Sequence, residues 1–202
     1  KFTVGLNYNL SHVDMDRIGT ENNTYAPVTA GYLQLPYVTP YGPDGQFQNT
    51  GFVANVIAIA ETGINKNYSD RSTGNAFLEW KILPGLKLKT DWGIDNYGID
   101  EKYRETDLLT PGGYAYRTHY TDNKWVSSNT VNYDKSFGKH TIGALAGYSF
   151  ETATLTKMMV EGSGFVSDDL PNVGSASTPI TASEEVFDWA LQSLFGRFNY
   201  DF

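Results

Sequence analysis

Hydrophobic and polar residues alternate at the start of the chain. Every even position from Phe2 to Leu10 is hydrophobic, and every odd position from Lys1 to Asn9 is polar or glycine. A period of two is that of a β-strand, in which successive side chains point to opposite faces of the sheet. Five later stretches follow this period better than a helical one, and we expect strands there too: 75–82, 86–95, 125–137, 140–151 and 194–202.

The connections between these predicted strands alternate between short and long. Leu83-Pro84-Gly85 and Gly138-Lys139 are tight-turn sequences, so each is expected to close a hairpin. The other three connections are long, at about 11–72, 96–124 and 152–188. Short turns at one rim and long loops at the other are typical of outer-membrane barrels. We therefore predict an all-β fold: an antiparallel transmembrane β-barrel segment of about six strands with long extracellular loops.

Aromatic residues on the hydrophobic face of these strands lie towards the strand ends. Aromatic girdles at the two bilayer interfaces would explain this placement. The residues concerned are Tyr8, Trp80, Trp92, Tyr133, Tyr148, Phe198 and Tyr200. A soluble β-sandwich with an aromatic core would show the same alternation. A soluble all-β carbohydrate-binding or adhesion module therefore stays open as the alternative.

Composition narrows the function classes. The 202 residues include no cysteine, which excludes a disulfide scaffold, a thiol nucleophile and a cysteine-ligated zinc site. The formal charge of −8 argues against a nucleic-acid partner, because no basic stripe is available to neutralise phosphates. The longest apolar run, Val56–Ala60, is far shorter than the roughly 20 residues of a membrane-spanning helix. Most of the negative charge is expected in one long loop, because the segment 151–188 holds seven acids: Glu151, Glu161, Asp168, Asp169, Glu184, Glu185 and Asp188.

Catalytic and metal-binding patterns are weak in this sequence. His12, His119 and His140 lie in separate segments without partners at metal-ligand spacing. The acids of 14–16 and 95–101 lack the full spacing of a calcium loop. Adjacent acids such as those of 168–169 and 184–185 point apart, unlike a glycosidase carboxylate pair. We expect no catalytic residue, no metal site and no cofactor, and do not expect an enzyme.

Several motifs in order resemble SusC/RagA-type TonB-dependent outer-membrane transporters. The stretch 74–90, Gly-Asn-Ala-Phe-Leu-Glu-Trp-Lys-Ile-Leu-Pro-Gly-Leu-Lys-Leu-Lys-Thr, is similar to a strand–turn–strand of that family. The stretch 193–202, Ser-Leu-Phe-Gly-Arg-Phe-Asn-Tyr-Asp-Phe, is similar to a later strand in which Gly-Arg-aromatic-Asn-Tyr recurs. Asn-Thr-Val-Asn-Tyr at 129–133 and Leu-Ala-Gly-Tyr at 145–148 fit the same order. The resemblance spans nearly the whole chain, although the loops match weakly.

The resemblance implies a 22-stranded barrel with an N-terminal plug. Residues 1–202 would be part of that barrel domain, with the plug and the remaining strands absent. It also implies a bacterial outer-membrane location and TonB-dependent import of an oligosaccharide or, as the second choice, a peptide. The implied partners are a SusD-like surface lipoprotein, the TonB complex acting through the plug, and outer-membrane lipid.

Two sets of residues are candidates for contacts in such a transporter. The polar residues of the strands would face the lumen or the plug: Asn7, Asn9, Asp91, Asp95, Asn132, Arg197 and Asn199. Tyrosine rings stack on sugar rings, so the tyrosines of the first long connection are candidate substrate contacts: Tyr25, Tyr32, Tyr37 and Tyr41. These tyrosines could instead pack their loop onto the barrel mouth or onto the lipoprotein.

Overall fold

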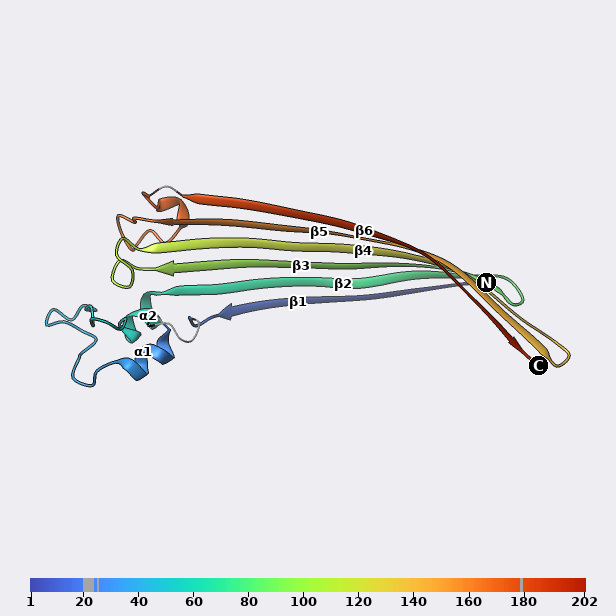
Figure 1. Cartoon of the computed structure of the whole chain (residues 1–202), viewed down its shortest axis with the longest axis horizontal. Helices are drawn as coiled ribbons and strands as arrows, with labels where there is room; N and C mark the ends of the chain where they lie inside the picture. Colours follow the sequence, from blue (N-terminus) through green and yellow to red (C-terminus); the bar gives the residue numbers. More distant parts are fainter. Residues whose placement is uncertain (20–23, 25, 179) are drawn as a thin grey trace.

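Six strands form one antiparallel sheet in chain order (Figure 1). The computed structural model describes residues 1–19, 24, 26–178 and 180–202. The strands are β1 (Phe2–Asp16), β2 (Ile64–Leu83), β3 (Leu86–Glu105), β4 (Tyr114–Phe137), β5 (His140–Ser163) and β6 (Thr181–Asp201). Within the described residues the sheet is not closed, and β1 and β6 are its two edges. This arrangement confirms the predicted fold class, an antiparallel barrel segment of six strands.

The strands are longer than the sequence pattern predicted. β2 to β6 contain 20 to 24 residues each, whereas about 9–11 suffice to cross a bilayer. The predicted loops were therefore too long. The loop predicted at 96–124 is the connection 106–113, and the loop predicted at 152–188 is the connection 164–180. The first connection is 17–63. The added strand segments carry polar and hydrophobic residues on both faces, as at Leu155, Met158 and Phe187. Backbone pairing therefore continues there while the hydrophobic alternation that predicts strands fades.

The acidic residues of 151–188 lie mainly in strands, so the prediction of one strongly acidic loop was wrong. Only Asp168 and Asp169 lie in the connection 164–180, and the other five acids lie in β5 or β6. The two predicted hairpins are confirmed at Gly85 and Gly138, whose φ angles of 87° and 61° suit glycine in tight turns.

Short helices lie in two of the long connections. The first connection contains α1 (Pro27–Leu33) and α2 (Val56–Thr62), and the third contains the 3₁₀ helix η1 (Val173–Ser175). The Asn55 side chain caps α2 by accepting hydrogen bonds from the backbone nitrogens of Ile57 and Ala58. These helices lie at the end of the sheet away from both chain termini (Figure 1). No described helix is both long and apolar enough to cross a bilayer.

The strand register separates the side chains into two faces. Residues paired across antiparallel strands point to the same face, so each chain of pairs is a row across the sheet. One such row runs Val4–Leu78–Thr90–Asn129–Tyr148–Leu194. We call the face that carries this row the apolar face, and the opposite one the polar face.

The hydrophobic part of the apolar face is a band next to the hairpin turns, bounded by aromatic groups. Phe2 stacks on Trp80 near the termini, with ring centroids 5.5 Å apart. At the other limit of the band, Trp125 lies 6.1 Å from Trp92 and 5.1 Å from Phe150. This band contains Val4, Leu6, Tyr8, Leu10, Leu78, Leu88, Ile94, Val131, Tyr133, Ile142, Ala144, Ala146, Tyr148, Leu194, Phe198 and Tyr200.

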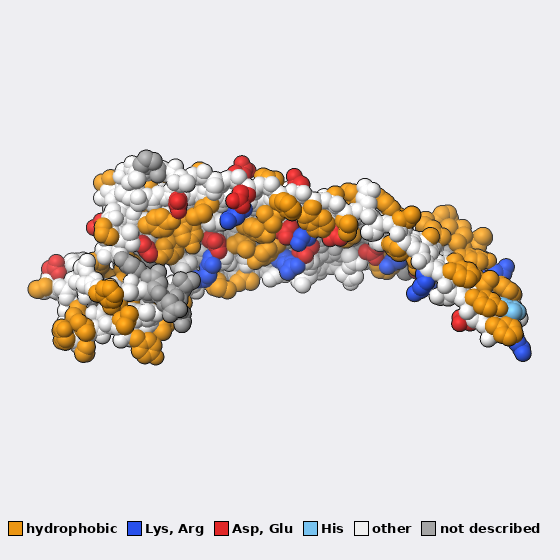
Figure 2. Space-filling model, viewed as in Figure 1, with side chains coloured by type: hydrophobic (Ala, Val, Ile, Leu, Met, Phe, Trp, Pro, Cys, Tyr) orange, Lys and Arg blue, Asp and Glu red, His pale blue; other side chains and the backbone are white. Residues whose placement is uncertain are grey.

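The large hydrophobic side chains of this band are not buried against the chain itself. Leu6 is 75% exposed and Leu194 is 86% exposed, whereas the buried hydrophobic residues are mostly alanines. Hydrophobic side chains cover much of the end that carries the termini, and charged side chains of both signs lie along the middle of the sheet (Figure 2). A soluble sandwich would bury such a band against a second sheet, and the described residues form a single sheet.

Arg104 joins the two upper loops, which we define as 106–113 and 164–180. Its side chain is 1% exposed and pairs with Asp168 at 3.0 Å, and its guanidinium lies 3.9 Å from the ring centre of Phe165. The Asp168 carboxylate also accepts a hydrogen bond from the backbone nitrogen of Asp107 at 3.1 Å. One buried guanidinium therefore holds both loops against the end of β3.

Candidate functional site: the polar face and its tyrosine cluster

The structure brings all seven residues predicted to face the lumen onto the polar face. They are Asn7, Asn9, Asp91, Asp95, Asn132, Arg197 and Asn199. Some of them are joined through Asn75, which accepts a hydrogen bond from Asn7 at 3.1 Å and donates one to Asp91 at 3.4 Å. Asn132 and Arg197 lie closer to the hairpin turns, where each pairs with its own neighbour on β3 or β5.

Charged residues in the middle of the polar face are balanced by neighbours. Arg71 donates two hydrogen bonds to the Asp95 carboxylate, at 3.0 and 2.7 Å. Lys124, the cross-strand partner of Asp95, pairs with Asp122 at 2.8 Å. Planar, bidentate contacts of this kind hold side chains in fixed positions. The middle of the polar face is therefore a wall of ordered, nearly neutral polar groups.

A tyrosine cluster lies on the same face, beyond the charged region and far from the termini. Tyr103 and Tyr116 are cross-strand partners whose rings stack at 4.9 Å with an interplanar angle of 13°. The ring of Tyr114 lies 6.3 Å from each of them. We call these three residues the tyrosine cluster. Tyr97 and Tyr120 form a second aromatic contact at 6.4 Å, closer to the apolar band.

Carboxylates accept hydrogen bonds from the hydroxyls of the cluster. Tyr114 donates to Glu161 at 2.7 Å, and Tyr103 donates to Glu105. Burial, helped by the Glu161 carboxylate, raises the pKa of Tyr114 to about 12, and burial beside Glu105 also raises the pKa of Tyr103. Both residues lie outside the hydrophobic band, each eleven residues along its strand from Trp92 or Trp125 at the aromatic limit. The cluster therefore presents neutral rings at physiological pH.

A cavity of about 480 Å³ adjoins the tyrosine cluster. Tyr103, Glu105 and Arg17 line it, as does Ile59 of α2. Arg17 is held by Glu101, which also accepts a hydrogen bond from Asn67 at 3.3 Å. The volume lies within the range of small-molecule sites. The Tyr103 ring, the carboxylate acceptors and the guanidinium groups of Arg17 and Arg104 can bind a neutral ligand that has hydroxyl or amide groups.

Three of the four tyrosines predicted as substrate contacts lie away from this cavity, and nothing in the structure tests their role. Tyr32 and Tyr37 are 87% and 78% exposed in the first long connection. Tyr41 stacks on Phe47 at 5.1 Å within a small isolated bridge. Tyr25 lies outside the described residues. The residues that line the cavity include none of the other three.

Sequence reasoning missed the tyrosine cluster because its residues fell in a segment predicted as a loop. Tyr97 and Tyr103 share the parity of Asp91 and Asp95 along β3, and Tyr114 and Tyr116 share one parity along β4. Extending the strand parity past the last hydrophobic residue would have placed them on the polar face.

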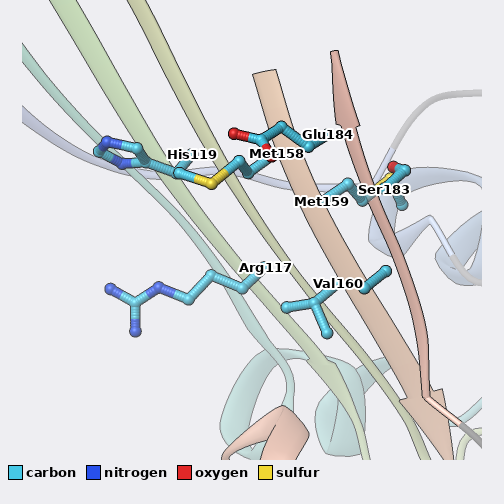
Figure 3. Close-up of a pocket in the computed structure, with 8 residues that line it drawn as sticks. Arg117, His119, Met158, Met159, Val160, Ser183 and Glu184 are labelled. Carbon is cyan, nitrogen blue, oxygen red and sulfur yellow. The ribbon is translucent and has the colours of Figure 1, made fainter. Parts of the chain in front are cut away.

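A shallow hollow of about 470 Å³ lies on the apolar side of the sheet, beyond the hydrophobic band (Figure 3). Arg117, His119 and Met158 project to one side of the strands there, and Met159 and Ser183 project to the other (Figure 3). Arg117 is occupied by two hydrogen bonds to Asp100, at 3.0 and 2.9 Å. The hollow therefore lies on the face opposite to the tyrosine cluster.

The histidines have local partners. His12 contacts Asp70 at 2.6 Å, and His140 contacts the Tyr200 hydroxyl at 2.7 Å. His119 lies 3.9 Å from Asp100. Among the described residues, no three His, Asp or Glu side chains are grouped as for a metal ion.

Comparison with known proteins gives consistent likenesses over all or most of the chain. No protein-family model matches. The chain is 24% identical over 216 residues to TonB-dependent receptor P3 of Formosa agariphila, covering 100% of this chain and 22% of that protein. It is 28% identical over 158 residues to TonB-dependent receptor P39 of the same organism, covering 73% of this chain and 15% of that protein.

Solved structures agree on the fold. The RagAB peptide importer in its closed-closed state matches with a TM-score of 0.77 at 24% identity, over 100% of this chain and 24% of that chain. The open-open state matches with a TM-score of 0.76 at 23% identity over the same shares. These matches cover this whole chain, which thus spans about a fifth to a quarter of the length of the proteins concerned. Together with the open six-stranded sheet, these likenesses support the predicted resemblance: residues 1–202 are similar to a segment of the barrel wall of SusC/RagA-type TonB-dependent transporters.

Proposed function

We propose that the complete protein imports an oligosaccharide, or as second choice a peptide, across the bacterial outer membrane in a TonB-dependent manner. Residues 1–202 are proposed to form part of one barrel domain, with the apolar band towards lipid and the polar face towards the lumen. The observation that carries this proposal is the separation of the two faces by register. Exposed hydrophobic side chains gather on one face, while hydrogen-bonded polar side chains gather on the other.

The tyrosine cluster is our proposed substrate contact. Its stacked rings offer the flat apolar surface on which sugar rings pack, and Glu105 and Glu161 offer acceptors for hydroxyl groups. The acids around it are already engaged by tyrosine hydroxyls or by Arg17, which favours a neutral oligosaccharide over a strongly charged ligand. A peptide is kept as the second candidate because the matching solved structures are described as a peptide importer.

The proposed partners follow from the positions of the exposed surfaces. A SusD-like surface lipoprotein would meet the first long connection, where Tyr32, Tyr37 and Phe52 are largely exposed. Energy would come from the TonB complex through a plug outside this chain. The seven polar-face residues predicted from sequence would line the import path or contact that plug.

Uptake measurements on the full-length protein test the proposal. Cells carrying Tyr103→Ala or Tyr116→Ala should take up labelled oligosaccharides at a rate about 10-fold lower than wild type. This expectation gives a stacked sugar ring the lower end of the range of about 1–3 kcal/mol that a nucleobase gains by stacking on one aromatic side chain. Tyr148→Ala, which removes a ring from the apolar face, is the matched control and should leave uptake unchanged when surface abundance is equal. Unaltered oligosaccharide uptake with reduced peptide uptake would select the second candidate, and unaltered uptake of both would refute the assignment of the cluster.

A further inference from the structure

Two buried guanidinium donors without partners line the cavity beside the tyrosine cluster. The Nε atoms of Arg17 and Arg104 are buried and have no hydrogen-bond partner among the described residues. Both arginines line the cavity of about 480 Å³, which lies where β1 ends, β2 begins and β3 ends. A buried N–H without an acceptor has lost its hydration without compensation, so such donors are usually satisfied. The two Nε–H groups therefore indicate a ligand that brings acceptor oxygens into the cavity.

Both guanidiniums are held in place by contacts within the chain. The terminal nitrogens of Arg104 donate to the Asp168 carboxylate at 3.0 Å and to the backbone carbonyl of Glu105, and its side chain is almost fully buried. A terminal nitrogen of Arg17 donates to the Glu101 carboxylate. Because the terminal nitrogens are engaged, each Nε–H keeps one position. Donors that are already positioned lose little conformational entropy when a ligand binds.

The charges around the cavity favour a neutral acceptor over an anion. The positive charges of Arg17 and Arg104 are each already paired with a carboxylate. Glu105 adds a carboxylate to the lining, and this group forms no ion pair within the described part of the chain. A ligand carboxylate or phosphate would place a further negative charge beside it, which like-charge repulsion disfavours. A carbonyl oxygen accepts the same hydrogen bonds without that repulsion.

The rest of the lining describes the groups that flank this carbonyl. The Glu105 carboxylate accepts hydrogen bonds from two neighbouring hydroxyls, and a carboxylate has about four acceptor sites, so capacity remains for an N–H of the ligand. Ile59, Ile64 and Leu109 give the cavity an apolar wall. The cavity thus offers donors for a carbonyl oxygen, an acceptor for an N–H and an apolar surface for a methyl group.

We propose that this cavity binds the acetamido group of an N-acetylated amino sugar. The acetamido carbonyl accepts from the Nε–H groups of Arg17 and Arg104, its N–H donates to Glu105, and its methyl group packs on the apolar wall. Tyr103 both lines the cavity and belongs to the tyrosine cluster, so the sugar ring that carries the acetamido group can pack on it. The inference rests on the proposed function and narrows its substrate class to oligosaccharides that contain N-acetyl groups.

A matched pair of trisaccharides tests the acetamido contact. Triacetylchitotriose and cellotriose share one backbone and differ by an acetamido group in place of a hydroxyl on each sugar ring. Calorimetric titration of the purified full-length protein should give an affinity for triacetylchitotriose about 10-fold higher than for cellotriose, because hydrogen bonds from charged donors are among the stronger ones. Equal affinities, tighter binding of cellotriose, or binding of neither trisaccharide would overturn the proposal.

Arginine-to-lysine changes locate the contact. Arg17→Lys and Arg104→Lys keep the positive charge of each ion pair but remove the Nε–H, so each should lower the affinity for triacetylchitotriose about 10-fold and change that for cellotriose less. Arg117→Lys is the matched control on the apolar face, where Nε already donates to Asp100 at 3.0 Å, and should change neither affinity. Arg17 has no contact with Asp168 or Phe165, so its variant stays informative if Arg104→Lys loosens the upper loops. An unchanged affinity of Arg17→Lys for triacetylchitotriose would refute the assignment.

A neutral peptide distinguishes the other common source of amide groups. Acetyl-trialanine amide carries carbonyl, N–H and methyl groups without a sugar ring, and should bind more weakly than triacetylchitotriose. Tighter binding of this peptide that depends on Arg17 would overturn the assignment to an amino sugar. Uptake separates this inference from the proposed function. Tyr103-dependent uptake of oligosaccharides that lack acetamido groups, together with equal affinities for the two trisaccharides, would refute the inference and leave the import function standing.

Discussion

Replacing Leu194 by arginine tests the orientation of the sheet in the membrane. Leu194 lies on the apolar face, between Ala190 and Tyr200, and is 86% exposed within this chain. If water surrounded this side chain, Leu194→Arg would change stability by at most about 0.5 kcal/mol, as is usual for exposed sites. If lipid surrounds it near the bilayer midplane, the cost is about 2–4 kcal/mol. The expected loss of folding stability is therefore several-fold larger in lipid than in water.

The matched control is Leu191→Arg, three residues earlier on the same strand. Leu191 is on the polar face opposite Glu151, where an arginine side chain can meet water or a carboxylate, so the expected loss is well below that of Leu194→Arg. Denaturant unfolding of the full-length protein in lipid bilayers measures both. A loss within about 0.5 kcal/mol for Leu194→Arg, or a larger loss for Leu191→Arg, would refute the assignment of the faces.

Three further changes probe local structure. Gly85→Ala should destabilise its hairpin by about 1 kcal/mol or more, because φ is 87° and the added Cβ would lie 2.2 Å from the Asp134 carbonyl oxygen. The midpoint of unfolding measures this loss, and unchanged stability would contradict the prediction. Arg104→Ala should lower the local stability of the two upper loops by about 2 kcal/mol, since Asp168 loses its buried partner, and faster hydrogen exchange in both loops would show it. The pKa of Tyr114 is raised from 10.0 to about 12, so the contribution of this residue to folding stability is present below pH 10 and is lost as the pH rises towards 12. Tyr114→Phe should reduce this loss of stability at alkaline pH. An identical dependence of stability on pH in the variant and the wild type would argue against it.

The sequence predicts this fold well where lipid dictates the pattern. Between Leu86 and Ile94 every second residue is matched to the apolar environment, and the hairpin at Gly85 is marked by its own turn residues. The same reasoning places Asn7 and Asp95 on a common face, because parity alone fixes which side each residue occupies. Under the proposed orientation, prediction succeeds here because lipid on one side of the sheet and water on the other set the alternation.

The sequence predicts less where both faces of the sheet meet polar surroundings. Past Ile94 the strand continues to Glu105, yet Asp100 and Lys102 on one face are as polar as Glu101 on the other. Only cross-strand pairing, which depends on residues far away in the chain, keeps this segment extended. The composition of the first long connection made its tyrosines plausible substrate contacts. Composition alone, however, carries no information on which rings lie close together in the folded protein.

The length of the strands gives the candidate site its position. Tyr103 lies nine residues beyond Ile94, and Tyr116 lies nine residues beyond Trp125, which corresponds to about 30 Å along each strand at about 3.3 Å per residue. A ring pair held by strands at this distance stays in register with the barrel wall, whereas rings on a flexible loop would not. Under the proposed function, a ligand would therefore meet the tyrosine cluster well before it reaches the membrane level. Under the same proposal, extending the sheet past the bilayer lets one rigid face carry both the rings that first contact the ligand and the polar side chains that lie behind the hydrophobic band.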